Sequence, residues 1–334
     1  MSIATSKPLY SGKAKDIFET EDPNILRAYF RDSATAFNAQ KKGEIHDKGK
    51  VNATISALLF QLLEQNGIKT HFIKQLSDRE LLVKKVKIIP LEVIVRNIAA
   101  GSLCKRLGIK EGKFLKEPIV EFSYKNDALG DPLLTRKYIT SALEITNNET
   151  IDYLISESLK INEIFKQFFL EIGIKVVDFK LEFGYDKDKN LILADELSPD
   201  NFRFWDAKTN EKLDKDRFRE DLGNTEGAYQ EMLKRVKEGT KQDHKFQAST
   251  LNSQSFKVRV QVLSKQDILD PQGQAVEKAL KSLGFTEIKD VKIGKEIVFE
   301  IKNGSKDIAK SQVKEMCEKL LANPVIEDYK IEIN

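Results

Sequence analysis

VVDFKLEFG, residues 176–184, decides the fold of the central part of this 334-residue chain, because charged and apolar side chains alternate along it. In a β-strand, successive side chains point to opposite faces of the sheet. One face therefore carries Asp178, Lys180 and Glu182. The other face carries the apolar side chains of Val177, Phe179, Leu181 and Phe183. We expect the apolar face to pack in a core and the charged face to carry chemistry.

The strand is predicted to fold back as a hairpin, because the polar run DKDKN follows it and LILADE, residues 191–196, has strand character. With a loop of residues 187–190, Asp195 lies opposite Glu182, with Cβ atoms about 5 Å apart. A shift by one residue would place Ala194 there instead. Mg²⁺ prefers one or two protein carboxylates together with water and substrate phosphates. The hairpin therefore indicates a magnesium–nucleotide site, although an amphipathic hairpin with solvated charges would show the same pattern.

The composition argues against several classes of protein. The 55 basic and 52 acidic residues nearly cancel, so there is no electrostatic footprint of nucleic-acid binding. Cys104 and Cys317 form no CxxC pair and the three histidines stand singly, which argues against a zinc site or a disulfide framework. No apolar run approaches the about 18 residues of a membrane span, and MSIATSKPLY lacks the apolar stretch of a signal peptide. We expect a cytoplasmic protein that binds neither nucleic acid nor a membrane.

Two domains are predicted, separated by a polar linker. The linker, residues 241–255, is rich in Ser, Thr, Asn and Gln. The first domain, residues 1–240, would combine a nucleotide-binding lobe over about residues 1–90 with a substrate and metal lobe over about residues 91–240. The second domain would comprise residues 256–334.

Periodicity predicts the elements of both domains. In the first domain, strand character is found in LYSGKAKDIFET, ILRAYFRD and LLVKKVKIIPLEVIVRN. Helical character is found in VNATISALLFQLLEQNG, residues 147–172, KDRFREDLG and EGAYQEMLKRVKEG. In the second, FKVRVQVLS, QAVEKALKSLG, FTEIKDVKIG (residues 285–294), KEIVFEIK, SKDIAKSQVKEMCEKLLAN (residues 305–323) and IEDYKIEI follow the order β-α-β-β-α-β. This is the order of ferredoxin-like domains.

Two segments of the first domain could bind anions. YSGKAK, residues 10–15, places a glycine beside two lysines and suits nucleotide phosphates, although it matches neither the Walker pattern nor GxGxxG, and an exposed basic turn would look the same. In PLEVIVRNIAAGS, Arg96 stands in an apolar strand and needs a partner. Its planar guanidinium fits a phosphate or a carboxylate, and a buried ion pair with Glu92 is the alternative.

Taken together, these segments resemble one family, SAICAR synthetase, the phosphoribosylaminoimidazole-succinocarboxamide synthase of purine biosynthesis. The similar segments, in the family's order, are YSGKAK, DSATAFNAQ with DKGKVN, IIPLEVIVRNIAAGS, NDALGDP, VVDFKLEFG, DELSPDNFRFWD and DKDRFREDLG. They cover about residues 7–238. The sequence departs from the family pattern at Ile89, where the family usually has valine before the proline.

The resemblance implies an α+β SAICAR-synthetase fold with an ATP-grasp-like or kinase-like nucleotide site. It implies ATP-dependent ligation of L-aspartate to the carboxylate of a carboxyaminoimidazole ribonucleotide, which releases ADP and phosphate. ATP and Mg²⁺ are then the expected cofactors. We also expect a homo-oligomer.

The resemblance further implies roles for single residues. For ATP these are Gly12, Lys13, Ala14, Lys15 and Lys84, and for the metal Glu182 and Asp195. Lys180 would lie beside the reacting carboxylate, oriented by Asp178. The substrate pocket would comprise Arg96, Ser102, Asp200, Arg203, Lys215, Asp216 and Arg219. A surface ion pair is the alternative for Asp200, Lys215, Asp216 and Arg219.

The second domain resembles the small accessory subunit of formylglycinamidine ribonucleotide synthase. The resemblance rests on KQDILDPQGQAV (residues 265–276), the LGF after the predicted helix and the GK at 294–295. It implies a non-catalytic domain that recruits the large and glutaminase subunits of that enzyme. From the residues alone, Asp270 with Pro271 predicts the start of a helix.

Two other functions stay open at this point. A kinase-like phosphotransferase would also use a phosphate-binding turn and a carboxylate pair, but the HRD and DFG segments of protein kinases are missing from the sequence. The chain could also be a scaffold or small-molecule sensor, since ferredoxin-like domains often bind partners without turnover.

Overall fold

The computed structural model describes residues 7–36, 41–241, 254–265, 267–303, 310, 313–314 and 316–333. The chain divides into two compact units, residues 1–248 and 249–334. None of the helices in these described ranges combines the length and the apolar character needed to cross a membrane.

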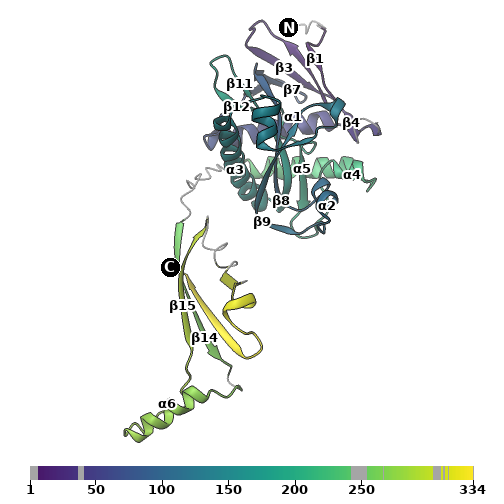
Figure 1. Cartoon of the computed structure of the whole chain (residues 1–334). Helices are drawn as coiled ribbons and strands as arrows, with labels where there is room; N and C mark the ends of the chain where they lie inside the picture. Colours follow the sequence, from purple (N-terminus) through teal and green to yellow (C-terminus); the bar gives the residue numbers. More distant parts are fainter. Residues whose placement is uncertain are drawn as a thin grey trace. The chain divides into compact units, whose positions relative to one another are not determined.

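The first unit begins with a five-stranded antiparallel sheet in the order β1-β2-β3-β7-β6. Its strands are β1 (Tyr10–Ser11), β2 (Lys15–Glu19), β3 (Ile25–Phe30), β6 (Phe72–Gln75) and β7 (Glu80–Lys84). Helix α1 (Lys48–Gln65) packs against β3, β6 and β7, and β4 (Ser33–Ala36) pairs with β5 (Lys41–Glu44) in a separate two-stranded sheet (Figure 1).

The second sheet of this unit carries the stretch that opened the sequence analysis. Its order is β10-β9-β8-β11-β12, and β13 also pairs with β11. The strands are β8 (Lys87–Ile98), β9 (Phe114–Tyr124), β10 (Leu133–Leu134), β11 (Ile174–Tyr185), β12 (Leu191–Ala194) and β13 (Phe202–Asp206). The other helical segments are α2 (Ser102–Leu107), η1 (Asp127–Leu129), η2 (Tyr138–Ala142), α3 (Asn148–Glu171), α4 (Asp216–Arg219) and α5 (Thr225–Gly239).

Helix α3 forms the core with the apolar face of β11. It begins where the sequence predicts, because the Asn147 side chain accepts a hydrogen bond from the Thr150 N–H at 2.9 Å. Phe165 on α3 packs against Phe179 and Phe202, with ring centroids 5.6 and 5.4 Å away. The predicted core face of the strand is thus confirmed over most of its length.

Val177 departs from that prediction. A bulge in the pairing of β11 with β13 lies between Val176 and Asp178. Val176 therefore joins the main core, whereas Val177 belongs to a small cluster with Ile98, Ala100 and Trp205.

The predicted register of the β11–β12 hairpin is wrong by one residue, because Glu182 pairs with Ala194. The loop has three residues, 187–189, instead of four. Asp186 Oδ1 accepts hydrogen bonds from the N–H groups of Asp188 and Asn190, both at 2.9 Å, and Lys189 has φ of 61°. This local network closes the shorter turn, so the side chains of one strand slide by one position.

Two other predictions for the first unit need correction. The segment predicted as one long strand forms β7 and β8, which Lys85 and Val86 separate. Of KDRFREDLG, only the four residues of α4 are helical.

The second unit contains β14 (Gln254–Ser264), α6 (Pro271–Ser282), β15 (Lys295–Asn303), η3 (Cys317–Leu321) and β16 (Glu327–Ile333). Its three-stranded antiparallel sheet has the order β15-β14-β16. The sheet buries Phe256, Val258, Val260 and Val262 with Val313 and Cys317. Part of the helix predicted at residues 305–323 lies outside the described residues.

The prediction of a strand at residues 285–294 is wrong. The described sheet therefore has one strand fewer than the ferredoxin-like arrangement. Asp270 caps α6 as predicted, accepting from the Gln272 and Gly273 N–H groups at 3.1 and 3.0 Å. The Ile293 N–H donates to the other oxygen of Asp270 at 2.7 Å. This contact holds the end of the segment at the start of α6 instead of at the sheet.

Replacing Phe202 by alanine should destabilise the first unit by about 3–5 kcal/mol, because it leaves a cavity between α3 and β11. Phe114→Ala is the matched control, since Phe114 is 67% exposed, and it should change the free energy of unfolding by less than about 0.5 kcal/mol. Guanidinium unfolding followed by the fluorescence of Trp205, the chain's single tryptophan, reports on this unit. Equal losses in both variants would contradict the assigned core.

Candidate active site

The middle of β11 lies beside a loop that carries several carboxylates. Along one edge of β11, β13 pairs with residues 174–179 and β12 with residues 182–185. The connecting loop, residues 195–201, therefore lies against the centre of the strand, where the Lys180 N–H donates to the Asn201 carbonyl oxygen at 2.9 Å. The charged face of β11 and this loop form the site together.

Lys180 and Glu182 project from β11 into a group of opposite charges. Lys180 Nζ lies 2.5 Å from Glu92 Oε1 and 3.4 Å from Glu182 Oε1. Lys125 donates to the other oxygen of Glu182. Because Glu182 is only 2% exposed, lysines rather than water compensate its charge.

Asp195 joins this group from the loop. Lys15 Nζ lies 2.6 Å from Asp195 Oδ1 and 3.5 Å from Glu196 Oε2. Asp195 has φ of 67°, in the left-handed region that few residues other than glycine adopt. Lys15, Lys125, Lys180, Glu182 and Asp195 are called the carboxylate cluster below.

The two acidic groups of the carboxylate cluster interact despite the corrected register. Burial raises the pKa of Glu182, and the negative charge of Asp195 raises it further. Burial alone would also raise the pKa of Asp195, but the charges of Lys15, Lys125 and Lys180 outweigh that effect and lower it. The pKa values of Lys15 and Lys180 are raised, because nearby carboxylates outweigh the opposing effect of burial. All three lysines face a pair of mutually repelling carboxylates.

This donor set fits a magnesium ion. Mg²⁺ prefers carboxylate oxygens and takes most of its ligands from water and phosphates. The effect of Asp195 on the pKa of Glu182 is the repulsion that a divalent cation would relieve. Within the described ranges, no group of three or more His, Cys, Asp or Glu side chains is arranged to hold a metal.

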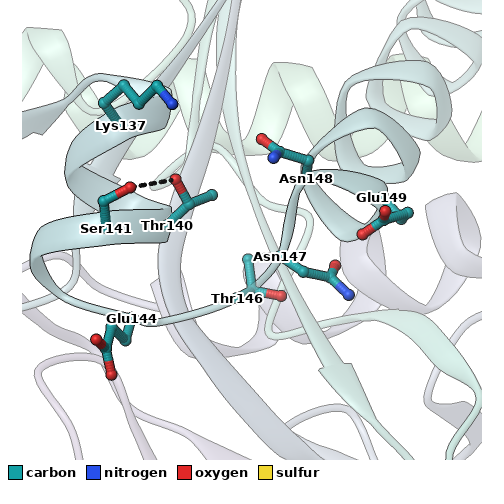
Figure 2. Close-up of a pocket in the computed structure, with 8 residues that line it drawn as sticks. All are labelled: Lys137, Thr140, Ser141, Glu144, Thr146, Asn147, Asn148 and Glu149. Carbon is teal, nitrogen blue, oxygen red and sulfur yellow. Dashed lines mark hydrogen bonds between the residues drawn. The ribbon is translucent and has the colours of Figure 1, made fainter.

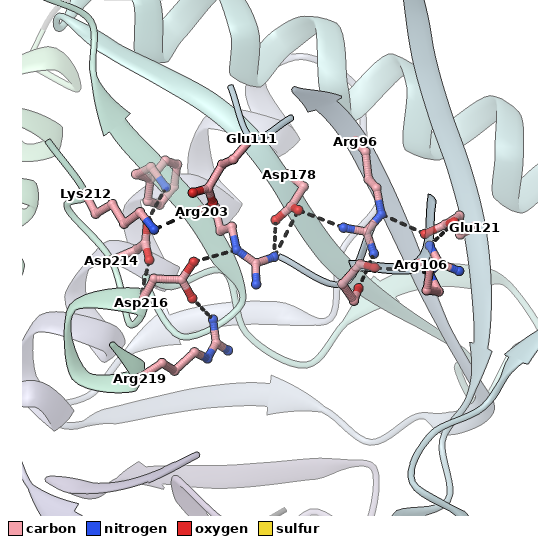
Figure 3. A network of polar contacts seen from close by, with 12 residues as sticks. Arg96, Arg106, Glu111, Glu121, Asp178, Arg203, Lys212, Asp214, Asp216 and Arg219 are labelled. Atoms are coloured by element: carbon pink, nitrogen blue, oxygen red, sulfur yellow. Dashed lines mark hydrogen bonds and ion pairs between the residues drawn. The ribbon is translucent and has the colours of Figure 1, made fainter. Parts of the chain in front are cut away.

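The same face of β11 holds a second cluster around Asp178 (Figure 3). Asp178 accepts from Arg96 Nη1 at 2.9 Å and from Arg203 Nη1 at 3.0 Å. Arg96, which is 3% exposed, also donates to Glu121 at 2.6 Å and to the Ser102 hydroxyl at 3.1 Å. Asp178 thus bridges two guanidinium groups.

Asp216 extends this cluster by binding Arg203 and Arg219. Arg203 Nε lies 2.6 Å from Asp216 Oδ2, and Arg219 donates to Oδ1. Burial opposes the charge of Arg203, yet Asp178 and Asp216 raise its pKa. Among the described residues, the Nη2 atoms of Arg203 and Arg219 have no acceptor, so both can donate to an anionic ligand. These five residues, Arg96, Asp178, Arg203, Asp216 and Arg219, are called the arginine cluster.

Gly101 leaves room for Arg203. A Cβ atom at Gly101 would lie 2.5 Å from Arg203 Nη2, and the backbone has φ of 54° there. Both facts favour glycine immediately before Ser102, the first residue of α2.

Asp200 lies in a third, more deeply buried group. Its Oδ2 accepts from Lys48 Nζ at 2.5 Å, and its Oδ1 accepts from the Tyr229 hydroxyl at 2.6 Å. Lys215 Nζ lies 3.7 Å from the same Oδ2 atom. Lys48 is fully buried and Tyr229 is 1% exposed. Through these contacts the group links α1 and α5 to the loop of residues 195–201.

The predicted phosphate-binding turn lies between β1 and β2. The Gly12 N–H donates to the Lys15 carbonyl oxygen at 2.8 Å, and Ala14 adjoins the start of β2. Lys13 is exposed and pairs with Asp127 at 2.6 Å. Of these residues, Lys15 belongs to the carboxylate cluster, whereas Lys13 lies at the surface.

Two further predicted residues have other neighbours. Lys84, at the end of β7, donates to the Thr70 carbonyl oxygen at 3.2 Å. The prediction that Asp178 orients Lys180 is wrong. Arg96 and Arg203 occupy Asp178, and Lys180 pairs with Glu92. Buried arginines attract the carboxylate more strongly than a lysine that has closer acidic partners.

Sequence reasoning did not single out four residues that contribute to these clusters. Lys48 lies within the DKGKVN segment and Lys125 immediately precedes NDALGDP, so the family resemblance could have identified both. Glu121 in β9 and Tyr229 in α5 carry no local signal in the sequence, because their roles arise only from the packing of distant elements.

A separate surface pocket of about 390 Å³ lies between η2 and the start of α3 (Figure 2). It is lined by Lys137, Thr140, Ser141, Glu144, Thr146, Asn147, Asn148 and Glu149. It contains no residue of the carboxylate or arginine cluster.

Comparisons with known proteins identify the relatives of this chain. A family profile described as SAICAR synthetase matches residues 8–236. Phosphoribosylaminoimidazole-succinocarboxamide synthase of Clostridium botulinum (strain Alaska E43 / Type E3) is 56% identical over 228 residues, which are 68% of this chain and 97% of that protein. A second profile, PurS, described as phosphoribosylformylglycinamidine (FGAM) synthase, matches residues 257–334.

Solved structures are similar to the first unit. Phosphoribosylaminoimidazole-succinocarboxamide synthase from Ehrlichia chaffeensis has a TM-score of 0.68 and 47% identity, covering 69% of this chain and 98% of that one. A SAICAR synthetase in complex with ADP has a TM-score of 0.66 and 49% identity, covering 68% of this chain and 96% of that one. The chain therefore belongs to the SAICAR synthetase family of purine-biosynthesis enzymes and carries, in addition, a PurS-like domain at residues 257–334.

Proposed function

We propose that the chain joins L-aspartate to the carboxylate of 5-amino-1-(5-phosphoribosyl)imidazole-4-carboxylate, with conversion of ATP to ADP and phosphate. The observation that carries this proposal is the arrangement along β11. Asp178 belongs to the arginine cluster, while Lys180 and Glu182 of the same strand face belong to the carboxylate cluster. A ribonucleotide held by the arginines would therefore present its own carboxylate to Lys180 and to the nucleotide site.

The chemistry requires this combination of groups. A carboxylate resists attack by an amine until ATP has converted it to an acyl phosphate with a good leaving group. The protein then has to position the reactants and neutralise their negative charge. Lys180 counters the charge that develops on the reacting carboxylate, and Lys15 binds the nucleotide phosphates. Mg²⁺ held by Glu182 and Asp195 would supply further charge neutralisation at those phosphates.

The arginine cluster suits the ribonucleotide. Arg203 and Arg219 are each anchored by Asp216 and keep an Nη2 donor available among the described contacts. Guanidinium groups bind phosphates through paired, charge-assisted hydrogen bonds. Ser102 and Arg96 complete this side of the pocket.

An assay of ADP release separates the ligase from a kinase-like phosphotransferase. With ATP, Mg²⁺ and the ribonucleotide present, a ligase should form ADP in a 1:1 ratio with the amide product only when L-aspartate is added. Sustained ADP formation with transfer of phosphate to the ribonucleotide, at a rate independent of aspartate, would support the phosphotransferase instead.

For residues 257–334 we propose assembly with the large and glutaminase subunits of formylglycinamidine ribonucleotide synthase. The PurS profile match supports this. We also propose that the chain forms a homo-oligomer, which light scattering of the purified protein would measure.

Glu182→Gln should lower kcat about 10²-fold or more, because the loss of a metal-binding charge removes several kcal/mol of stabilisation. The protein should still fold, since burial raises the pKa of Glu182 and a neutral isostere avoids the desolvation of its charge. Glu117→Gln, at an exposed position of β9, is the control and should leave kcat unchanged. Near-normal turnover of Glu182→Gln would refute the metal assignment.

Gly101→Ala should raise the KM for the ribonucleotide about tenfold, which corresponds to about 1.4 kcal/mol, because the new Cβ displaces Arg203. Gly108→Ala is the matched control. Gly108 also has positive φ, 65°, but no atom lies within 4 Å of its Cβ position. The control should lose some thermal stability yet keep the KM. Equal KM values in both variants would show that Arg203 does not bind the ribonucleotide.

Deleting residues 241–334 should leave most of the ligase activity, because the C. botulinum relative matches the first unit over 97% of its own length. Steady-state kcat and KM of the full chain and the truncated chain would be compared. A loss of turnover with the first unit still folded would favour the scaffold or sensor function.

A further inference from the structure

The turn of residues 12–14 connects β1 to β2 and directly precedes Lys15, which belongs to the carboxylate cluster. In the proposed ligation this turn lies beside the nucleotide phosphates. Successive backbone N–H groups can bind an anion, but only if they face it, because carbonyl oxygens in the same place would repel the phosphates. The contacts of the turn therefore decide whether its backbone can bind a nucleotide.

All three carbonyl oxygens of the turn have partners in one short segment, residues 31–33. Arg31 donates through its guanidinium Nη2 to the Gly12 carbonyl oxygen. The Ser33 hydroxyl donates to the Lys13 carbonyl oxygen at 3.0 Å. The backbone N–H of Arg31 donates to the Ala14 carbonyl oxygen at 2.8 Å. The carbonyl groups of the turn are thus held toward the connection between β3 and β4.

The N–H groups of the turn have fewer partners. The Gly12 N–H closes the turn by donating to the Lys15 carbonyl oxygen at 2.8 Å. In the part of the chain that the structure describes, the N–H groups of Lys13 and Ala14 donate to no protein acceptor. Two neighbouring backbone donors are therefore available beside Lys15.

The planarity of the peptide bond gives each of these donors a direction. In a trans peptide, the carbonyl oxygen and the N–H of the following residue point in opposite directions, and the described peptides of this chain are trans. By holding the Gly12 carbonyl, the Arg31 guanidinium turns the Lys13 N–H away from itself. By holding the Lys13 carbonyl, Ser33 does the same for the Ala14 N–H.

Arg31 is itself fixed by a second element. Its Nη1 lies 3.5 Å from Asp16 Oδ1 on β2, so one guanidinium connects the turn to the strand that follows it. The Arg31 side chain is 35% exposed, so its removal would not empty a core position. It would leave the Gly12 carbonyl without this partner, and the peptide between Gly12 and Lys13 would be free to rotate.

We propose that Arg31 is a positioning residue of the nucleotide site and directs the Lys13 N–H at a phosphate oxygen of ATP. Ser33 directs the Ala14 N–H in the same way. This assignment rests on the ligation proposed above. Arg31 acts through the backbone, because its guanidinium stays on Gly12 and Asp16. The two N–H groups add charge-assisted hydrogen bonds to the ionic attraction of Lys15 for the phosphates.

The first test measures the steady-state KM values of the full chain. Arg31→Ala should raise the KM for ATP about tenfold or more, because the turn loses a hydrogen bond to a charged group. The KM values for the ribonucleotide and for L-aspartate should not change. Ser33→Ala should raise the KM for ATP by about two- to fivefold, since the contact that it removes is between neutral groups.

Arg27→Ala is the matched control for Arg31→Ala. Arg27 lies on β3, pairs with Glu80 and stacks on Phe18 with its guanidinium carbon 4.3 Å from the ring centroid. None of its described contacts is with the turn. The control should lose thermal stability but keep the KM for ATP, because a smaller folded fraction lowers the apparent kcat and not the KM. A purely structural role of Arg31 would give the same pattern.

Hydrogen–deuterium exchange separates positioning from direct binding of a phosphate by Arg31. Saturating ADP with Mg²⁺ should slow exchange in a peptide that covers residues 11–16 of the unmodified chain. Arg31→Ala, also saturated, should lose most of this protection, whereas Arg27→Ala should keep it. If Arg31 only bound the phosphate directly, saturation would offset the weaker affinity and the turn of Arg31→Ala would stay protected.

An unchanged KM for ATP in Arg31→Ala, or full protection of its turn by ADP, would overturn the assignment. Equal increases of this KM in Arg31→Ala and Arg27→Ala would also overturn it. The exchange measurement needs only ADP and Mg²⁺ and does not depend on ligation. If the unmodified chain formed no amide product from ATP, the ribonucleotide and L-aspartate, the proposed ligation itself would fail, so the two failures are distinguishable.

Discussion

The pairing of β11 with two different strands along one edge is the constraint on which the site depends. β13 pairs with the first half of β11 and β12 with the second half, so the chain must leave the sheet between them at the level of Lys180. The loop of residues 195–201 is the result. It brings Asp195, Glu196 and Asp200 against the charged face of a strand whose other face packs on α3. One strand therefore determines both the core and the position of the reacting groups.

Charge compensation makes this arrangement tolerable for the fold. Isolated charges lose several kcal/mol when they are taken out of water, and only close partners with good geometry recover that energy. The site contains buried carboxylates and buried arginines, and each is paired, as Asp178 is with Arg96 and Arg203. When an anionic substrate binds, the charged side chains of the site can therefore exchange an ionic partner within the protein for one on the substrate. The substrate does not enter an apolar pocket. Such a site is organised before any ligand binds, which reduces the reorganisation needed during catalysis.

The sequence predicts the long elements and the chemistry better than the register. Alternation identified β11, and helical spacing identified α3, because each signal extends over many residues. The turn at Asp186 depends on hydrogen bonds to a single side chain, which alternation does not reveal, so the register predicted for the hairpin is wrong by one residue. The segment at 285–294 has strand-like alternation, but Asp270 binds its end. The partners of Arg96 and Asp200 come from elements far apart in the chain, and no local pattern encodes such contacts. The resemblance to a family, not periodicity, supplied most of the candidate residues.

The left-handed backbone at Asp195 limits how this site can change during evolution. Asparagine and aspartate adopt that conformation far more readily than β-branched or bulky residues, and glycine adopts it without strain. Cysteine, whose thiolate would shift the preference toward softer metals, is not among the residues that favour this conformation and would strain the loop that also carries Glu196 and Asp200. Drift at this position is therefore confined to a small set of side chains, and a lineage that needed a thiolate ligand here would have to rebuild the whole turn.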